Sequence, residues 1–430
     1  MQLDTKIIRS IAAKVGTPFW LYDAAIIRQR IADVKFMTSA PNVQARFAMK
    51  ACPATKVLRE MHAAGIWIDA VSGNEALRAL HAGHAPGNNP PVVCFTADVF
   101  RDNALDVVLK NGLLPNIGSP GMLRQLVAAG YRGPVSIRVN PGFGHGHVNT
   151  CDTGGPSSKH GIWSDQLMST RSDAVNSGLK IVMLHAHIGS GPSHQELHDN
   201  LTRLAVEFSD LAPLFPDLES VSLGGGIPHN YRDSHAQIPI GPLRDLFTSC
   251  QQRIRESAKR ELRLEIEPGR YYVAPGCTLV TQVHDVKTTA TNAKGAGATF
   301  AMVDAGFVDL VRPAMYGSYH KIEVFDGTTG APLSTEAEPI VVAGPLCESG
   351  DVFTRGGADE ELQPRMLPRP KTGDIVLLRD AGAYGYAMSS NYNSIGKAPQ
   401  VWVEPDGTCE LISRRETLDD ILKAETSERL

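Results

Sequence analysis

A lysine, a glutamate and two glycine-rich turns are the groups of this sequence best suited to do chemistry. Lys50 ends the apolar, alternating run VQARFAMK, and Glu267 ends the run RLEIE. The turns HIGSG (187–191) and GGGIP (224–228) follow two other apolar runs. A lysine amine forms Schiff bases with carbonyl groups, and glycine turns present backbone N–H groups to anions. The groups therefore indicate a site for a carbonyl compound that carries a phosphate.

These groups match the needs of pyridoxal phosphate. This cofactor requires a lysine for its Schiff base, a phosphate pocket and a partner for its pyridine nitrogen. Lys50 is suited to the first task and Glu267 to the third, and His187 is suited to stack on the ring. A phosphate pocket without the Walker pattern is predicted from Ser190, Gly224, Gly225, Gly226 and the backbone of Gly269.

The runs that carry these groups belong to a longer alternation of strands and helices. Amphipathic segments such as TKVLREMHAAG and DNALDVVLKNG separate the apolar runs, and several end in glycine, as helix C-termini prefer. Eight strands in this alternation predict an α/β fold, a (β/α)8 TIM barrel, whose functional groups collect at the strand ends. An open, doubly wound sheet is the structural alternative. The predicted strands are 43–49, 66–70, 92–95, 114–117, 134–139, 181–187, 219–223 and 263–267.

The pattern changes after residue 270. Residues 271–415 contain strand-like runs without long helical intervals, such as TLVTQVHDV and GDIVLLRDAG. The N-terminal residues predict a helix, the strand FWLYD and a second helix from near Ala24, and TLDDILKAE predicts a short closing helix. We therefore expect a cofactor-binding barrel over 30–270 and a second, β-sandwich or barrel-like domain from 1–29 and 271–430.

Composition limits the functional classes. The 430 residues include 42 basic and 46 acidic side chains, a net charge of −4. Neither this balance nor any basic run suggests binding to nucleic acid or to a membrane surface. Seven scattered cysteines without a CxxC pair favour reduced thiols, and the 14 histidines show no metal-site spacing. With no signal-peptide core or membrane-spanning run, the sequence predicts a cytoplasmic protein without a metal.

Several motifs carry a resemblance to a known family. They are FAMKAC, HIGSG, GGG, EIEPGRYYVA, VDAGFVDLVRPAMYGSYH, AGPLCESGDVF and DAGAYGYAMSSNYN, and they cover nearly the whole chain in family order. With them the chain resembles the barrel-type pyridoxal-phosphate decarboxylases of basic amino acids, and among these the diaminopimelate decarboxylases. CESGD and RPAMYGSYH are the specific elements. The resemblance implies an alanine racemase-like barrel followed by an all-β domain, and a homodimer with shared active sites.

The implied reaction is a decarboxylation that depends on pyridoxal 5′-phosphate. Its substrate would be meso-2,6-diaminopimelate, which loses carbon dioxide at its D-centre to give L-lysine, the last step of lysine biosynthesis. The resemblance assigns Lys50 to the Schiff base, His187 to the ring face and Glu267 to the pyridinium nitrogen. Further cofactor contacts are implied for Ser190, Gly225, Gly226, Gly269, Arg270 and Tyr384. Substrate contacts are implied for Arg270, Arg312, Tyr316, Glu348 and Tyr384.

Two further residues are implied to act across the dimer. Cys347 and Glu348 would enter the active site from the partner subunit, with Cys347 as the acid that protonates the substrate carbon. A carboxylate at the pyridine nitrogen, here Glu267, separates a decarboxylase from the racemases of similar barrel, which use an arginine there. Arg312 beside Tyr316 favours a substrate with a distal carboxylate.

Alternatives remain at this stage. One is a decarboxylase of another diamino acid, such as ornithine, lysine or carboxynorspermidine, and the other is a pyridoxal-phosphate-binding protein without catalysis. Asp69 and Glu75 are candidates for orienting Lys50 or the ring, whereas we interpret His185 as a packing or supporting residue.

Cys52 and the loop 140–163 lie near the predicted site, but we assign neither of them a catalytic role. We interpret Cys52 as a packing residue, because no histidine or aspartate motif lies beside it. The loop 140–163 carries His160 where many family members have an aromatic residue, as in a subgroup of diaminopimelate decarboxylases. The predicted cofactor site does not depend on this loop.

Overall fold

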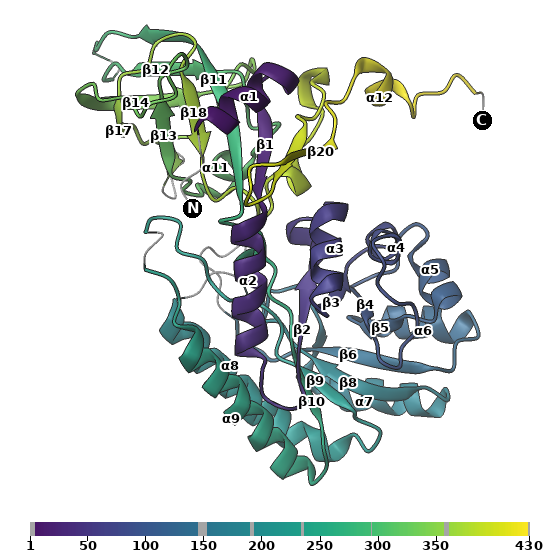
Figure 1. Cartoon of the computed structure of the whole chain (residues 1–430). Helices are drawn as coiled ribbons and strands as arrows, with labels where there is room; N and C mark the ends of the chain where they lie inside the picture. The colour runs from purple at the N-terminus through teal and green to yellow at the C-terminus, as the bar shows by residue number, and fades with distance from the viewer. Residues whose placement is uncertain are drawn as a thin grey trace. The chain divides into compact units, whose positions relative to one another are not determined.

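The computed structural model describes residues 5–144, 153–189, 193–233, 236–293, 295–356 and 361–428. Contacts between Cα atoms divide the chain into two units, one built on a barrel and the other on a mixed β-sheet (Figure 1). The barrel unit is Gln29–His229 with Gln237–Tyr272, and the β unit is Met1–Arg28, Asn230–Ala236 and Val273–Leu430.

The described residues of the barrel unit form a closed ring of eight parallel strands. The ring closes because β5 pairs with β6 and β10 pairs with β2. This confirms the predicted TIM barrel, and the open doubly wound alternative is wrong. A short strand, β7 (Ile162–Trp163), adds to β6 outside the ring. The ring strands are β2 (Val43–Ala48), β3 (Trp67–Ala70), β4 (Val93–Ala97), β5 (Leu114–Ile117), β6 (Pro134–Asn140), β8 (Lys180–His185), β9 (Ser220–Ser222) and β10 (Arg263–Ile266).

Helices surround these strands, and α8 and α9 lie side by side (Figure 1). A capping box opens α8, where the Ser193 hydroxyl accepts from the Glu196 N–H and the Glu196 carboxylate accepts from the Ser193 N–H. A left-handed glycine, Gly112, ends α5. The helices are α2 (Ala24–Met37), α3 (Thr55–Ala63), α4 (Gly73–His81), α5 (Ala104–Asn111), α6 (Pro120–Ala128), α7 (Ser164–Asn176), α8 (His194–Leu211), α9 (Ile240–Ala258) and α10 (Arg270–Val273), with the 3-10 turns η1 (Met49–Ala51) and η3 (Ala212–Leu214).

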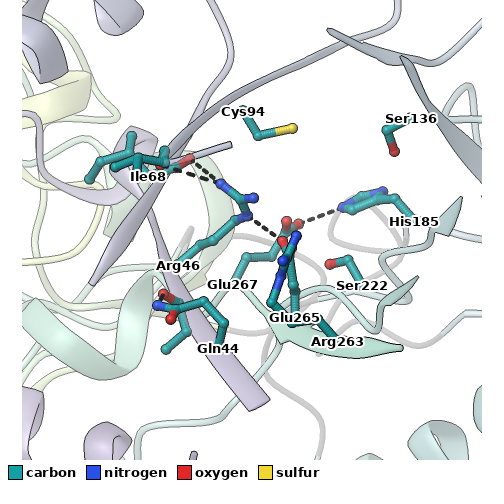
Figure 2. A network of polar contacts seen from close by, with 12 residues as sticks. Gln44, Arg46, Ile68, Cys94, Ser136, His185, Ser222, Arg263, Glu265 and Glu267 are labelled. Atoms are coloured by element: carbon teal, nitrogen blue, oxygen red, sulfur yellow. Dashed lines mark hydrogen bonds and ion pairs between the residues drawn. The ribbon is translucent and has the colours of Figure 1, made fainter. Parts of the chain in front are cut away.

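The inside of the barrel holds charged side chains. Arg46 of β2 donates to Glu265 of β10 over 2.6 Å, and these side chains are 1% and 0% exposed. Arg263 donates to the other oxygen of Glu265 over 2.8 Å (Figure 2). Burial raises the pKa of Glu265, but the two guanidinium groups outweigh it and lower the pKa below its usual range. This carboxylate therefore stays charged inside the protein and ties β2 to β10.

The β unit is built on one mixed, nine-stranded sheet among its described residues. Its main path runs β17-β14-β12-β11-β1-β19-β20, and β18 joins β11 to β13. The N-terminal strand β1 lies between β11 and β19, as the run FWLYD predicts. The strands are β1 (Phe19–Asp23), β11 (Cys277–Thr288), β12 (Thr299–Val303), β13 (Ile322–Phe325), β14 (Ala337–Ala343), β17 (Arg365–Pro368), β18 (Ile375–Leu378), β19 (Gln400–Val403) and β20 (Cys409–Ser413), with a separate pair β15 (Arg355–Gly356) and β16 (Glu361–Leu362).

Helix α1 (Thr5–Val15) covers part of this sheet. Its buried side chains Ile8 and Ile11 share an apolar cluster with Phe19, Leu21 and strand residues Val280, Leu377 and Val401. The closing helix predicted from TLDDILKAE is present as α12 (Leu418–Leu422), which begins with a capping box. The remaining helical segments are α11 (Arg312–Tyr316) and the 3-10 turns η4 (Tyr386–Met388) and η5 (Tyr392–Ser394).

Three kinds of feature are absent from the described residues. They contain no helix long and apolar enough to cross a membrane. In the same residues, no group of three or more metal-ligating side chains is assembled. The six cysteines within the described ranges form no disulfide with one another, and Cys347 and Cys409 are exposed.

The buried ion pair inside the barrel gives a first prediction. We expect Arg46→Met to lower the free energy of unfolding by about 3 kcal/mol, because removing one partner leaves the buried Glu265 undercompensated. The matched control is Arg255→Met, whose pair with Glu261 spans 3.3 Å with 41% and 65% exposed side chains. Exposed pairs contribute about 0–1 kcal/mol, so the control should change little. Urea unfolding of both variants measures the difference, and equal losses would contradict the prediction.

Candidate active site

Lys50 lies just beyond the end of β2, in the turn η1. The Ala48 N–H donates to the Pro268 carbonyl over 3.3 Å, so this turn contacts the segment that follows β10. A Cβ atom at Gly269 would lie 3.0 Å from the Ala48 carbonyl and 3.2 Å from the Ala51 Cβ. Glycine at 269 therefore lets the two strand ends approach, which brings Lys50 and Glu267 to the same end of the barrel.

Glu267 follows β10 and is 5% exposed. Its Oε1 atom lies 2.9 Å from Nε2 of His185, at the end of β8 (Figure 2). Burial raises the pKa of Glu267, but the charge and hydrogen bond of His185, followed by the charge of Lys50, outweigh it and lower the pKa well below its usual range. Glu267 is therefore an ionised carboxylate at neutral pH.

His187 lies two residues beyond β8 and is 7% exposed. The Gly225 N–H donates to its Nδ1 atom over 3.0 Å. Burial, and next the charge of Lys50, lower the pKa of His187 well below its usual range, so the ring is neutral at pH 7. Because Nδ1 accepts a hydrogen bond, the ring proton lies on Nε2. A neutral, fixed imidazole is suited to lie against an aromatic ring.

Asp69 is a second buried carboxylate near Glu267. It belongs to β3 and is 1% exposed, and no described residue forms a hydrogen bond of good geometry with either of its oxygens. Burial and then the charge of Glu267 raise its pKa, while Lys50 and the nearby Thr96 hydroxyl lower it less. Glu75, the other candidate for orienting Lys50, instead accepts a hydrogen bond from the Val71 N–H over 2.8 Å.

The glycine turn after β9 packs backbone against backbone. A Cβ atom would lie 2.4 Å from the Ala186 carbonyl at Gly224, and 2.5 Å from the Glu267 carbonyl at Gly225. Gly226 has a φ of 104°, and a Cβ atom there would lie 2.6 Å from the Gly189 carbonyl. Only glycine fits here, and the turn leaves no side chain to repel a phosphate. Ser190, which the sequence assigns to this pocket, lies outside the described residues.

Together these groups fit pyridoxal phosphate. One end of the barrel presents an amine at Lys50, an ionised carboxylate at Glu267, a neutral ring at His187 and glycine turns free of side chains. The fit rests on the lowered pKa of Glu267, because an ionised carboxylate is what a protonated ring nitrogen requires. Arg270, the first residue of α10, is also buried in this unit, at 7% exposed.

The β unit gathers three of the other predicted site residues. Arg312 begins α11, is 4% exposed and donates to the Ser318 hydroxyl over 3.1 Å. Its guanidinium carbon lies 5.9 Å from the ring centre of Tyr316 and 5.8 Å from that of Tyr384. Tyr384 has a left-handed φ of 58°, which is uncommon for a tyrosine and marks a specially held position.

Cys347 and Glu348 lie in the loop after β14, and both are exposed. The loop is held by Asp351, whose carboxylate accepts from the Leu346 N–H over 2.8 Å and from the Phe307 N–H over 2.6 Å. The Glu348 carboxylate accepts from the Gly350 N–H over 2.8 Å. The structure therefore fixes the backbone of this loop and leaves its two predicted functional side chains at the surface.

The loop after β6 is tied down at its two ends. The Asn140 amide accepts from the N–H groups of Gly142 and Gly155 and donates to the Gly155 carbonyl. His160, the unusual residue of this loop, lies with its Nδ1 atom 2.6 Å from Oδ2 of Asp98. No sequence signal singled out Asp98 or Asn140, although both stand at strand ends, where polar residues are expected to act. Residues 145–152 of this loop lie outside the described ranges.

Comparison with known protein families identifies the family to which this chain belongs. The pattern of the family described as "Pyridoxal-dependent decarboxylase, pyridoxal binding domain" matches residues 24–274, more than half of the chain. The chain belongs to the pyridoxal-dependent decarboxylases. The predicted resemblance, enzyme class and pyridoxal cofactor are thereby confirmed at the level of the family.

Within the pyridoxal-dependent decarboxylases, full-length relatives narrow the group. The chain is 41% identical over 425 residues to a diaminopimelate decarboxylase of Streptomyces coelicolor, covering 98% of this chain and 92% of the relative. It is 40% identical over 422 residues to that of Escherichia coli K12, covering 96% and 95%. A crystal structure of a diaminopimelate decarboxylase superimposes with a TM-score of 0.89 at 38% identity, covering 98% of each chain. The chain is thus a member of the diaminopimelate decarboxylases.

The glycine turn gives a prediction on cofactor binding. Gly225→Ala would place a Cβ atom 2.5 Å from the Glu267 carbonyl and displace either the turn or Glu267. Overpacking costs about 1–3 kcal/mol, so we expect the dissociation constant of pyridoxal phosphate to rise about tenfold or more. The control Gly241→Ala lies in α9 with no atom within 4 Å of its added Cβ. A cofactor titration followed by absorbance compares them, and similar dissociation constants would refute the role of the turn.

Proposed function

We propose that this chain decarboxylates meso-2,6-diaminopimelate at its D-centre, with pyridoxal phosphate held at the end of the barrel, and releases L-lysine and carbon dioxide. The observation that carries the proposal is the buried, ionised Glu267 at the barrel end that also presents Lys50. Full-length similarity to diaminopimelate decarboxylases supports the choice of substrate. The reaction would complete lysine biosynthesis.

Bound pyridoxal phosphate supplies a conjugated ring that accepts the electron pair left on the α-carbon when carbon dioxide departs. Glu267 makes the site suited to this chemistry, because its carboxylate holds a proton on the ring nitrogen. Lys50 would provide the amine that holds the cofactor. His187 restricts the ring from one face, and its neutral state adds no second positive charge to the site. Arginine in place of Glu267 would favour a racemase.

The phosphate would be held by the backbone of Gly225, Gly226 and Gly269. Their lack of side chains permits close approach, and the N–H groups of such turns bind anions. Arg270, Ser190 and Tyr384 are proposed to complete the cofactor contacts.

The substrate's distal end is a second amino acid group, with a carboxylate and an ammonium. Arg312 is suited to the carboxylate, because a guanidinium binds carboxylates in a planar, two-pronged manner and is held here beside Tyr316 and Tyr384. Arg270 is proposed for the same task, and Glu348 for the distal ammonium. A diamine-forming decarboxylase has no distal carboxylate to bind, so Arg312 would repel its substrate.

We further propose a homodimer in which each active site is completed by the partner subunit. Cys347 and Glu348 support this, since both are exposed while their loop is fixed by Asp351. Cys347 would then deliver the proton that replaces carbon dioxide at the α-carbon. A cytoplasmic location stays a prediction, supported by the scattered cysteines.

Lys50 gives the most direct test of the cofactor site. Borohydride treatment should fix pyridoxal phosphate to the peptide that contains Lys50, and Lys50→Ala should lose both this label and detectable carbon dioxide release. Peptide mass spectrometry and a carbon dioxide assay measure the two effects. Lys35→Ala, which removes an exposed lysine of α2, serves as the control and should keep both. A label on any other lysine would overturn the assignment.

A substrate panel tests the role of Arg312. With meso-diaminopimelate, lysine, ornithine and carboxynorspermidine offered separately, we expect the native protein to prefer meso-diaminopimelate. Arg312→Met should lower kcat/KM for this substrate about 10- to 100-fold, since a hydrogen bond to a charged group contributes about 1.5–3 kcal/mol. Activity on lysine should fall much less. A native preference for a substrate without a distal carboxylate would reject the proposed specificity.

A further inference from the structure

His185 occupies a position that the sequence assigns to packing or to support of the site. It is the last residue of β8, is 1% exposed and lies with its Nε2 atom 2.9 Å from Oε1 of Glu267. Figure 2 shows the two side chains pointing toward one another inside the barrel. A buried imidazole that donates to a buried carboxylate does more than fill space, because each group satisfies the other.

Small residues on the strand between them make this contact possible. In the register of β8, β9 and β10, Ser222 pairs with His185 on one side and with Glu265 on the other. Ser222 is 1% exposed, and its hydroxyl accepts from the Gly224 N–H over 3.2 Å. A short side chain at this point leaves room for His185 to reach past β9 to Glu267.

The contact leaves the two oxygens of Glu267 unequal. Oε1 is the oxygen that accepts from His185, so this histidine does not occupy Oε2. The structure thus separates a supported oxygen from one that can receive a partner. We propose that His185 is a positioning residue that holds Glu267 ionised and oriented, so that Oε2 is left for the ring nitrogen of pyridoxal phosphate. This inference rests on the proposed function.

The second buried carboxylate explains why such a residue is needed. Asp69 and Glu267 interact strongly enough for each to affect the ionisation of the other, and one negative charge close to another is costly in a buried site. His185 bonds to Glu267 and not to Asp69. Burial and Glu267 raise the pKa of Asp69, which the charge of His185 lowers only slightly, whereas both the charge and the hydrogen bond of His185 lower the pKa of Glu267. The histidine therefore selects which carboxylate carries the charge.

Other charged and titratable groups also surround Glu267. Burial raises its pKa, and first His185 and then Lys50 lower it, while His187 is a neutral ring nearby. Glu267 in turn interacts with groups on other strands, namely Asp69 of β3, Cys94 of β4 and Arg138 of β6. Arg46 and Arg263 are engaged with Glu265. Of these groups, His185 lies within hydrogen-bond distance of the Glu267 carboxylate, with 2.9 Å between its Nε2 atom and Oε1.

The pH dependence of cofactor binding tests this role. A lowered pKa keeps Glu267 charged as pH falls, so native protein should retain pyridoxal phosphate well into the acid range. His185→Leu removes the donor, raises the pKa of Glu267 and should move the acid midpoint of cofactor retention upward by at least about one pH unit, a tenfold change in proton affinity. The absorbance of bound pyridoxal phosphate, followed across pH without substrate, measures the midpoint.

His84→Leu is the matched control. His84 is another buried imidazole of the barrel unit, 3% exposed, whose Nε2 atom lies 3.1 Å from the Leu58 carbonyl. Its loss should lower stability without moving the midpoint. If His185→Leu does not fold, His185→Ala, which also lacks the donor, replaces it.

The outcomes separate this inference from the proposed function. A raised midpoint in the donor-lacking variant, with the control unchanged, supports the role of His185. A midpoint equal to that of native protein overturns it, and so does an equal shift in both histidine variants. Native protein that binds no pyridoxal phosphate would overturn the proposed function itself.

Discussion

The structure of the barrel unit depends on keeping negative charge stable where water is excluded. Glu265 belongs to β10 and Glu267 directly follows this strand, and both are buried. Burial disfavours their charged forms, so each requires a positively charged or donating partner. Glu265 has two guanidinium groups, whereas Glu267 has a single imidazole. The first arrangement saturates its carboxylate and holds strands together. At Glu267, His185 bonds to Oε1 and does not occupy Oε2. Glu265 is therefore suited to a structural role, and Glu267 to binding a further partner.

The backbone at the strand ends follows from the same requirement. The groups that surround Glu267 come from different strands, so the turns that follow β2, β9 and β10 must approach closely to bring them together. Gly225 packs on the Glu267 carbonyl, and its N–H donates to His187. One glycine thus helps to position both Glu267 and the His187 ring. Gly269 performs a comparable role beside Ala48. The glycines thus serve the geometry of charged side chains as well as the space for a phosphate.

The sequence predicted the local elements well and the cross-barrel contacts poorly. The run LPNI corresponds to β5 without error, and the alternation of strands and helices predicted the closed ring, because each element has its own hydrophobic period. The sequence predicted Lys50 and Glu267 as site residues because functional groups of a TIM barrel collect at the ends of its strands. The His185–Glu267 bond was not predicted, because it depends on the register across three strands and on the small size of Ser222. Strands β13, β17 and β20 were also missed, because short strands in a mixed sheet lack a clear pattern.

The β unit meets a different requirement, that of holding exposed side chains in place. Cys347 and Glu348 lie at the surface, where side chains and loops are ordinarily mobile. Asp351 restricts the loop from beneath by accepting two backbone N–H groups, and burial raises its own pKa, which is a cost to its charged form. A loop held at this cost would lose less conformational freedom on entering the site of the proposed partner subunit, so association would be less opposed by entropy. The fixed backbone beneath exposed side chains is therefore what the proposed shared active site requires of each subunit.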